Sequence, residues 1–357
     1  MMRSLRTAAS VLLAILLAGC ANFTYYVQSV RGQLDVWSRT YDIETVIASP
    51  DTAEPLRQKL GAVLSIREYA SAELGLPRNA SYRSYANLDR PFAVWNVFAA
   101  PEFSIEPRQW CFMFAGCVNY RGYFKTTDAD AFAAGVAAEG YDVFVGGVPA
   151  YSLLGYFSDP VLNTFIHYPT PHLARLIFHE LAHQVVYARD DTVFNESFAV
   201  TVEEEGARRW IERHGTQEDA RVHEVVTRRR GDFLKLIETY RKQLNALYLT
   251  RLAPDAMRDR KAALFRQMHE DYRQLRESWG GFAGYDRWFA HKANNALLAS
   301  VGIYNQRVPA FQALLARERG DLPRFYEAAK KLARMSKPER TAALDELMLR
   351  TAALPTH

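Results

Sequence analysis

The motif His179-Glu180-Leu181-Ala182-His183 constrains the fold of this chain more than any other part of its sequence. Thr170 and Pro171 predict a helix start, with a capping side chain followed by proline, and apolar residues continue at helical spacing. Residues four apart on a helix project from one face, so both imidazoles can reach a single cation. Glu180 is rotated by about 100° from His179 and can address a water molecule beside that cation.

A catalytic zinc commonly takes three protein ligands and leaves one position for water, so the motif needs a third ligand. The helical pattern breaks after Tyr187 and restarts near Phe194, with an Asp or Thr cap between them. Glu196 follows His183 by thirteen positions, and a short turn would bring it back beside the first helix. Glu196 is therefore the first choice. Glu203 is the rival, either as the ligand itself or as the partner that orients a histidine.

The first residues predict export. Two arginines precede an apolar stretch over 8–17, which is too short to span a bilayer as a helix. It ends in Leu17-Ala18-Gly19-Cys20, a pattern that resembles a bacterial lipobox, in which the cysteine becomes lipidated. This predicts a signal peptide over 1–19 and a membrane anchor at Cys20, with an ordinary signal peptide as the alternative. Ala21 in place of Asp resembles lipoproteins sorted to the outer membrane, facing the periplasm.

An oxidising compartment favours a disulfide between the two remaining cysteines, Cys111 and Cys117. The alternative is a pair of small buried thiols, because two cysteines alone would leave a zinc shell half empty. The composition is globular, with 49% hydrophobic and 24% charged residues, which excludes a disordered chain. The formal net charge of +4 gives no indication of a nucleic-acid partner.

The rest of the chain predicts a single, mainly helical α+β unit. Apolar residues follow helical spacing over 22–46 and 55–74, whereas aromatic and β-branched runs indicate strands before the motif. Two long charged helices joined near 253–255 follow, and Arg228-Arg229-Arg230 is typical of a solvated face, or of contact with an anionic surface. The predicted parts are N-terminal helices over 20–78, a small mixed β-sheet over 79–157, active-site helices over 170–213 and C-terminal helices over 217–350.

These motifs together resemble a known family, the putative bacterial aminopeptidase lipoproteins, which are zinc peptidases of the gluzincin type. The resemblance includes Asn195-Glu196-Ser197-Phe198-Ala199 and segments within 25–34, 116–124, 147–152 and 294–304. It implies a zincin-like fold, one Zn²⁺ held by His179, His183 and Glu196, and removal of N-terminal residues from peptides. One departure stands out: in the well-studied gluzincins the glutamate follows at a longer spacing, which would select Glu203.

The resemblance also implies roles for other residues. Glu180 would take the proton of the attacking water, and a later tyrosine would stabilise the oxyanion. Tyr304 is the candidate, although a packing role is the alternative for one of 19 tyrosines, and Tyr151 and Tyr156 are lesser candidates. Glu203 or Glu204 could hold the ammonium of a peptide substrate.

Related zinc peptidases bind an extended peptide along an edge strand beside the metal. Here that strand would be the stretch 145–152, in which Gly147, Val148 and Tyr151 contact substrate, with a plain turn as the alternative. An endopeptidase, or a non-catalytic lipid-anchored binding protein, are the other functional hypotheses. The intact Glu180 favours an enzyme, since zinc binding alone does not require it.

Overall fold

The computed structural model describes residues 23–112 and 116–352. The fold is α+β and predominantly helical, as the sequence predicts. The predicted signal peptide and Cys20 lie outside the described residues. Within the described ranges, no helix combines the length and the hydropathy that crossing a bilayer requires.

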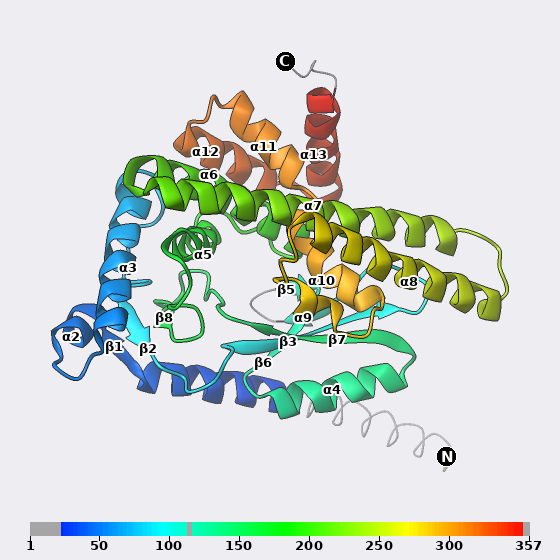
Figure 1. The fold of residues 1–357 in the computed structure, drawn as a ribbon, viewed down its shortest axis with the longest axis horizontal. Helices are drawn as coiled ribbons and strands as arrows, with labels where there is room; N and C mark the ends of the chain where they lie inside the picture. The colour runs from blue at the N-terminus through cyan, green and yellow to red at the C-terminus, as the bar shows by residue number, and fades with distance from the viewer. Residues whose placement is uncertain (1–22, 113–115, 353–357) are drawn as a thin grey trace, which may run out of the picture.

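The N-terminal region is more broken than its apolar spacing predicts. One helix covers residues 23–38 and runs along the same side of the sheets as α4 (Figure 1). The single helix expected over 22–46 is wrong, because the chain leaves that helix to form β1 (Thr40–Asp42), and Asp42 then caps α2 (Ile43–Ala48). The helix expected over 55–74 is confirmed as α3 (Glu54–Ala72).

The β-structure of the described residues is divided among three small sheets. The mixed sheet has the order β1-β2-β8, in which β2 (Ser84–Ala86) is antiparallel to β1 and parallel to β8 (Val161–Leu162). The strands of the other two sheets, an antiparallel sheet and a two-stranded pair, lie between β2 and β8 in the sequence. The sequence predicted one small sheet over 79–157, but the structure has three, because short turns and α4 interrupt the strands. The remaining elements are β3 (Val94–Pro101), β4 (Trp110–Phe112), β5 (Gly116–Val118), β6 (Arg121–Tyr123), α4 (Thr126–Ala138) and β7 (Tyr141–Val148).

The antiparallel sheet has the order β6-β3-β7 and packs between two helices. Side chains of a strand alternate between the two faces of a sheet. Val97 of β3 therefore packs with Ala129 of α4 on one face, whereas Phe98 packs with Ala296 of α10 (Asn295–Asn305) on the other. Both faces of the sheet are covered, and β7 is an end strand. It ends at Val148, so only the first half of the edge strand expected over 145–152 is a strand.

The motif lies on α5 (Thr170–Ala182). The predicted cap is wrong by one position, because Pro169 is the N-cap and Thr170 is the first helical residue, with no side-chain capping hydrogen bond. The helix ends at His183, its C-cap, which keeps helical backbone angles of φ −58° and ψ −24°. The two histidines of the motif therefore retain the spacing of one helical turn that a shared cation requires.

The second helix of the pair, α6 (Thr192–His214), packs closely against α5. Gly206 permits this approach, because a Cβ at that position would lie 2.8 Å from the ring of Phe178. Leu173 and Ile177 on the buried face of α5 join the main apolar core together with Phe198 of α6. This core fixes the orientation of the α5 face that carries the motif.

The C-terminal part is entirely helical in the described residues. The two long helices are α7 (Gln217–Tyr248) and α8 (Pro254–Ser278), with the break where the sequence predicts it, and Figure 1 shows them side by side. They share a second apolar core that contains Phe233 of α7 and Tyr272 of α8. The helices that follow α8 are α9 (Asp286–Phe289), α10, α11 (Val308–Arg317), α12 (Leu322–Ala333) and α13 (Lys337–Ala352).

Candidate metal centre

The connection between α5 and α6 is fixed by its own polar side chains. Asp191 caps α6 by accepting a hydrogen bond from the backbone N–H of Phe194 at 3.1 Å, so the expected Asp cap is confirmed. The side chain of Asn195 accepts a hydrogen bond from the N–H of Ala188 at 2.7 Å and donates to its carbonyl at 2.9 Å. Because Asn195 immediately precedes Glu196, these bonds set the position from which Glu196 reaches α5.

The helix α13 also contacts the connection between α5 and α6. Arg340 of α13 donates to the carboxylate of Asp191 at 2.8 Å, and both side chains are buried. Lys337 donates to the backbone carbonyl of Asp190 at 2.9 Å. A buried ion pair holds its partners in one geometry, since separating them would leave an uncompensated charge. The start of α6 is therefore held by contacts on two sides.

Three side chains from α5 and α6 form a group that could hold a metal ion. One ligand atom from each of His179, His183 and Glu196 lies within 4.8 Å of the others. Glu196 Oε2 is 3.2 Å from His179 Nε2 and 3.7 Å from His183 Nε2. Tetrahedral zinc, with bonds of about 2.0–2.1 Å, separates its ligand atoms by about 3.3 Å. The spacing and the two-imidazole, one-carboxylate donor set therefore fit zinc.

Glu203 lies on the other side of the first histidine. Its Oε2 atom is 2.8 Å from His179 Nδ1, whereas Glu196 faces Nε2 of the same ring. Its Oε1 atom accepts hydrogen bonds from Arg175 at 2.5 Å and from Arg230 at 2.8 Å. An acceptor at Nδ1 places the ring proton there and leaves Nε2 free to bind a metal. The geometry thus favours the orienting role over the ligand role for Glu203.

The charges of this centre oppose the effect of burial. Burial favours the neutral form of His179, but the hydrogen bonds that its ring donates to the carboxylates of Glu196 and Glu203 outweigh burial and raise the pKa of the imidazole. Burial likewise raises the pKa of Glu203, yet Arg175 and Arg230 hold that pKa well below its ordinary value. The carboxylate of Glu203 is therefore ionised at neutral pH. A divalent cation would take the place of the proton that the carboxylates attract to His179.

The metal-binding group lines a cavity of about 830 Å³, whose wall also includes Glu180, Tyr120, Tyr187 and Tyr304. Burial raises the pKa of Glu180, and the charges of His179 and His183 oppose this rise. Burial and the nearby carboxylate of Glu196 raise the pKa values of Tyr120 and Tyr304 well above the ordinary value for tyrosine. Both phenols are therefore neutral hydrogen-bond donors at physiological pH.

Comparison with known proteins gives one match. A family model described as "Putative aminopeptidase" matches residues 24–344. The chain belongs to this family. No curated protein and no solved structure matches the chain. The match extends over nearly all of the described residues, and it includes both helices that carry the metal-binding group.

The cavity contains some of the residues predicted to contact substrate in this family. Val148 and Tyr151 lie on its wall, and so does Tyr304. Gly147 does not line the cavity; a Cβ there would lie 2.3 Å from the ring of Phe92, so its role is close packing. Tyr156, a lesser candidate for the oxyanion, is exposed and also lies outside the lining.

Two acidic residues expected to hold the substrate ammonium are directed elsewhere. Glu203 binds His179 and two arginines, and Glu204 accepts a hydrogen bond from Gln312 at 3.2 Å. Neither lines the cavity. The structure therefore does not bring these two carboxylates onto the wall of the cavity.

Sequence reasoning assigned no role to several side chains of this cavity, among them Tyr120 and Gln33. Tyr120 precedes β6, and Gln33 lies on the helix over 23–38, far from Glu180 in the chain. No spacing rule connects these positions with the motif. The available signal was that both fall within segments that carry the family resemblance, around residues 25–34 and 116–124.

The two cysteines pair across β4 and β5. Cys111 and Cys117 are directly opposite each other in the strand register and are joined by a disulfide. The backbone N–H of Cys117 donates to Asp190 Oδ1 at 2.6 Å. Phe112 and Val118, the neighbours of the two cysteines, lie on the cavity wall. The bridge therefore connects this wall to the segment that leads into α6.

Proposed function

We propose that this protein is a zinc-dependent peptidase that removes N-terminal residues from peptides. The observation that carries the proposal is the group formed by His179, His183 and Glu196 on the wall of a cavity that Glu180 also lines. The peptidase class agrees with the family to which the chain belongs. The choice of zinc rests on the donor set and its spacing.

The residues around the centre have separable chemical roles. Zinc held by His179, His183 and Glu196 would supply a Lewis acid and would lower the pKa of a water molecule. Glu180 would accept the proton of that water and deliver it to the leaving amine. Tyr304 or Tyr120 donates a hydrogen bond to the carbonyl oxygen as negative charge develops there. Glu203 holds the His179 proton on Nδ1.

Two substitutions test the assignment of zinc ligands and base. Wild-type protein should contain one zinc per chain by elemental analysis. Glu180→Gln should retain zinc and lose hydrolysis by about 10²–10⁴-fold, because an amide cannot accept the proton. Glu196→Ala should lose zinc. Glu212→Gln, an exposed substitution on α6, is the matched control. Full zinc occupancy in Glu196→Ala would contradict the ligand set, and undiminished hydrolysis by Glu180→Gln would remove Glu180 as the base.

An endopeptidase is the second candidate, and one observation favours it. Among the described residues that line the cavity, Glu180 and Glu196 are the carboxylates, so no further acidic side chain is on the wall to pair with an ammonium group. Peptides with free and acetylated N-termini distinguish the two activities. Cleavage that requires the free amine supports an aminopeptidase, whereas cleavage of both forms at internal bonds supports an endopeptidase.

We further propose that the enzyme acts in the bacterial cell envelope, anchored through Cys20. The proposal is supported by the signal-like sequence over 1–19 and by the pattern Leu17-Ala18-Gly19-Cys20. Wild-type protein should incorporate radiolabelled palmitate and fractionate with the outer membrane. Cys20→Ser should remain unlabelled, because acyl attachment requires the thiol. A freely soluble, unlabelled wild type would contradict the anchor without affecting the zinc chemistry.

A further inference from the structure

The cavity beside the metal centre has few charged side chains. Glu180, Glu196 and the two histidines are in its lining, and no described residue of the lining is Lys, Arg or Asp. Most of the remaining wall is apolar or aromatic, including Leu34, Trp37, Phe112, Val118, Phe124 and Phe157. This part of the wall can cover apolar surface of a ligand, but it cannot neutralise a charged side chain.

Several of these apolar residues are exposed to solvent at the cavity mouth. Val30 and Leu34 of the helix over 23–38 are 59% and 54% exposed, and Phe157 is 56% exposed. Trp37 lies on the same helical face, and its ring centroid is 4.9 Å from that of Phe157. The helix and the segment after β7 thus form one apolar rim. Contiguous exposed apolar surface of this kind marks a binding site.

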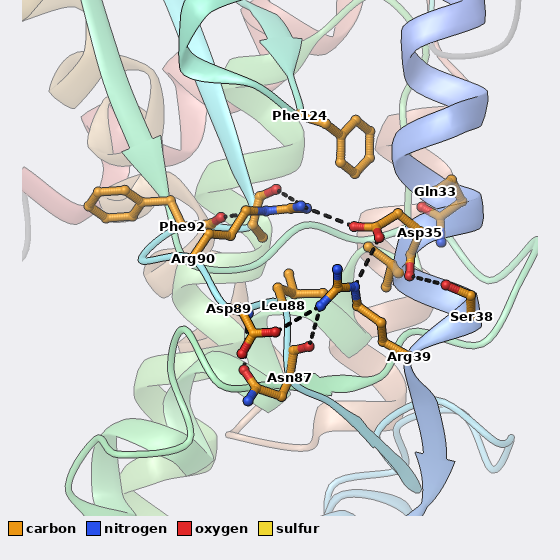
Figure 2. A network of polar contacts seen from close by, with 12 residues as sticks. Gln33, Asp35, Ser38, Arg39, Asn87, Leu88, Asp89, Arg90, Phe92 and Phe124 are labelled. Carbon is orange, nitrogen blue, oxygen red and sulfur yellow. Dashed lines mark hydrogen bonds and ion pairs between the residues drawn. The ribbon is translucent and has the colours of Figure 1, made fainter.

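Polar contacts hold the helix over 23–38 in place (Figure 2). Asp35 accepts hydrogen bonds from Arg39 at 2.9 Å and from Arg90 at 3.2 Å. Arg39 also donates to Asp89 at 3.0 Å, and Arg90 donates to the carbonyl of Phe92 at 3.1 Å. These contacts tie the helix to the segment that leads into β3. The apolar wall is therefore preformed, which reduces the ordering that binding requires.

We propose that this cavity selects peptides whose side chains next to the cleaved bond are large, uncharged and apolar. The proposal rests on the proposed peptidase function and names its substrate class. An apolar side chain would cover the wall formed by Leu34, Trp37 and Phe157. A lysine or glutamate side chain would lose its hydration there without gaining a partner.

The experiment measures binding, so it does not depend on turnover. Zinc-loaded Glu180→Gln protein is titrated calorimetrically with Phe-Ala-Ala, Lys-Ala-Ala and Glu-Ala-Ala, each with a free and an acetylated N-terminus. For each peptide, the form that binds more tightly, free or acetylated, is compared. We expect the Phe peptide to bind about 10–100-fold more tightly than either charged peptide. Equal or tighter binding of a charged peptide would overturn the proposal. Failure of wild-type protein to hydrolyse any peptide would instead count against the proposed function alone.

Two further substitutions, each made in the Glu180→Gln background, locate the selectivity on the wall. Leu34→Asp places a carboxylate on the cavity wall at an exposed position, so it should reduce the preference for Phe over Lys about tenfold or more. Leu249→Asp is the matched control, because Leu249 is 80% exposed and lies outside the lining. An unchanged Phe-to-Lys ratio in Leu34→Asp would overturn the proposal. Loss of binding to phosphatidylglycerol vesicles with that ratio unchanged would assign the rim to a membrane surface instead.

Discussion

The strongest prediction concerns Glu203, because its carboxylate forms hydrogen bonds with three other side chains. Arg175, Arg230 and His179 all bond to it, and its side chain is buried. In Glu203→Gln one oxygen remains, so the amide N–H₂ must face either the arginines or His179. Facing the arginines, it leaves a buried guanidinium without an anionic partner. Facing His179, it donates to Nδ1 and forces the ring proton onto Nε2, the atom that faces Glu196.

Either orientation of the glutamine weakens the centre by an amount that can be measured. Loss of one hydrogen bond to a charged group lowers the free energy of unfolding by about 1.5–3 kcal/mol, and two such bonds are affected. Removal of a partner that orients a ligating histidine typically lowers metal affinity by about 10–100-fold. We therefore expect Glu203→Gln to lose about 3–6 kcal/mol of stability as apoprotein. We also expect zinc to bind one to two orders of magnitude more weakly.

The assays are urea unfolding in the presence of a chelator and zinc titration against a competing chromophoric chelator. Glu212→Gln is the control, because this exposed glutamate pairs with Arg208 on the same helix, and such pairs contribute about 0.5 kcal/mol or less. Unchanged stability and zinc affinity in Glu203→Gln would refute the reasoning. Loss of zinc as complete as in Glu196→Ala would show that Glu203 is a ligand.

Two further predictions concern groups around the cavity. Burial raises the pKa of Asp159 to about 7, above its ordinary value, so the folded chain binds this proton more tightly than the unfolded chain does. Stability should therefore fall as the pH rises from about 4 to 8, and Asp159→Asn should flatten that decline in urea unfolding; an unchanged slope would contradict it. The double substitution Cys111→Ser and Cys117→Ser should lower stability by about 2 kcal/mol and weaken peptide binding. Zinc content should not change, and a parallel loss of zinc would be evidence against this account.

Local sequence patterns predicted the features that depend on one or two helical turns. The spacing of His179 and His183, the Asp191 cap and the break between α7 and α8 follow from neighbouring residues, since helical geometry relates positions a few residues apart. The proximity of Glu196 followed from the short connection between the helices. The helix expected over 22–46 was wrong for a related reason: apolar spacing persisted across a break that Asp42 caps.

The sequence could not separate the roles of Glu196 and Glu203. These residues are seven positions apart on α6, about two turns or 10.5 Å along its axis, so both lie on one face. The structure shows that one imidazole lies between them and presents a different nitrogen to each. Which nitrogen faces which carboxylate depends on how α5 crosses α6. That crossing is set by tertiary contacts such as the approach at Gly206, which no spacing rule contains.

The charged residues of α7 gave little information in the sequence. In the structure one of them, Arg230, acts directly on the metal centre through Glu203. Arg228-Arg229-Arg230 is typical of a solvated face, and Arg228 is indeed exposed. Arg230, however, donates to Glu203, and Arg229 lies over the ring of Phe282 with its guanidinium 4.1 Å from the centroid. Because Glu203 in turn holds His179, α7 is connected to the metal-binding group through a continuous chain of charges. Displacing α7 would therefore change the charge that His179 experiences, although no residue of α7 is among the candidate ligands.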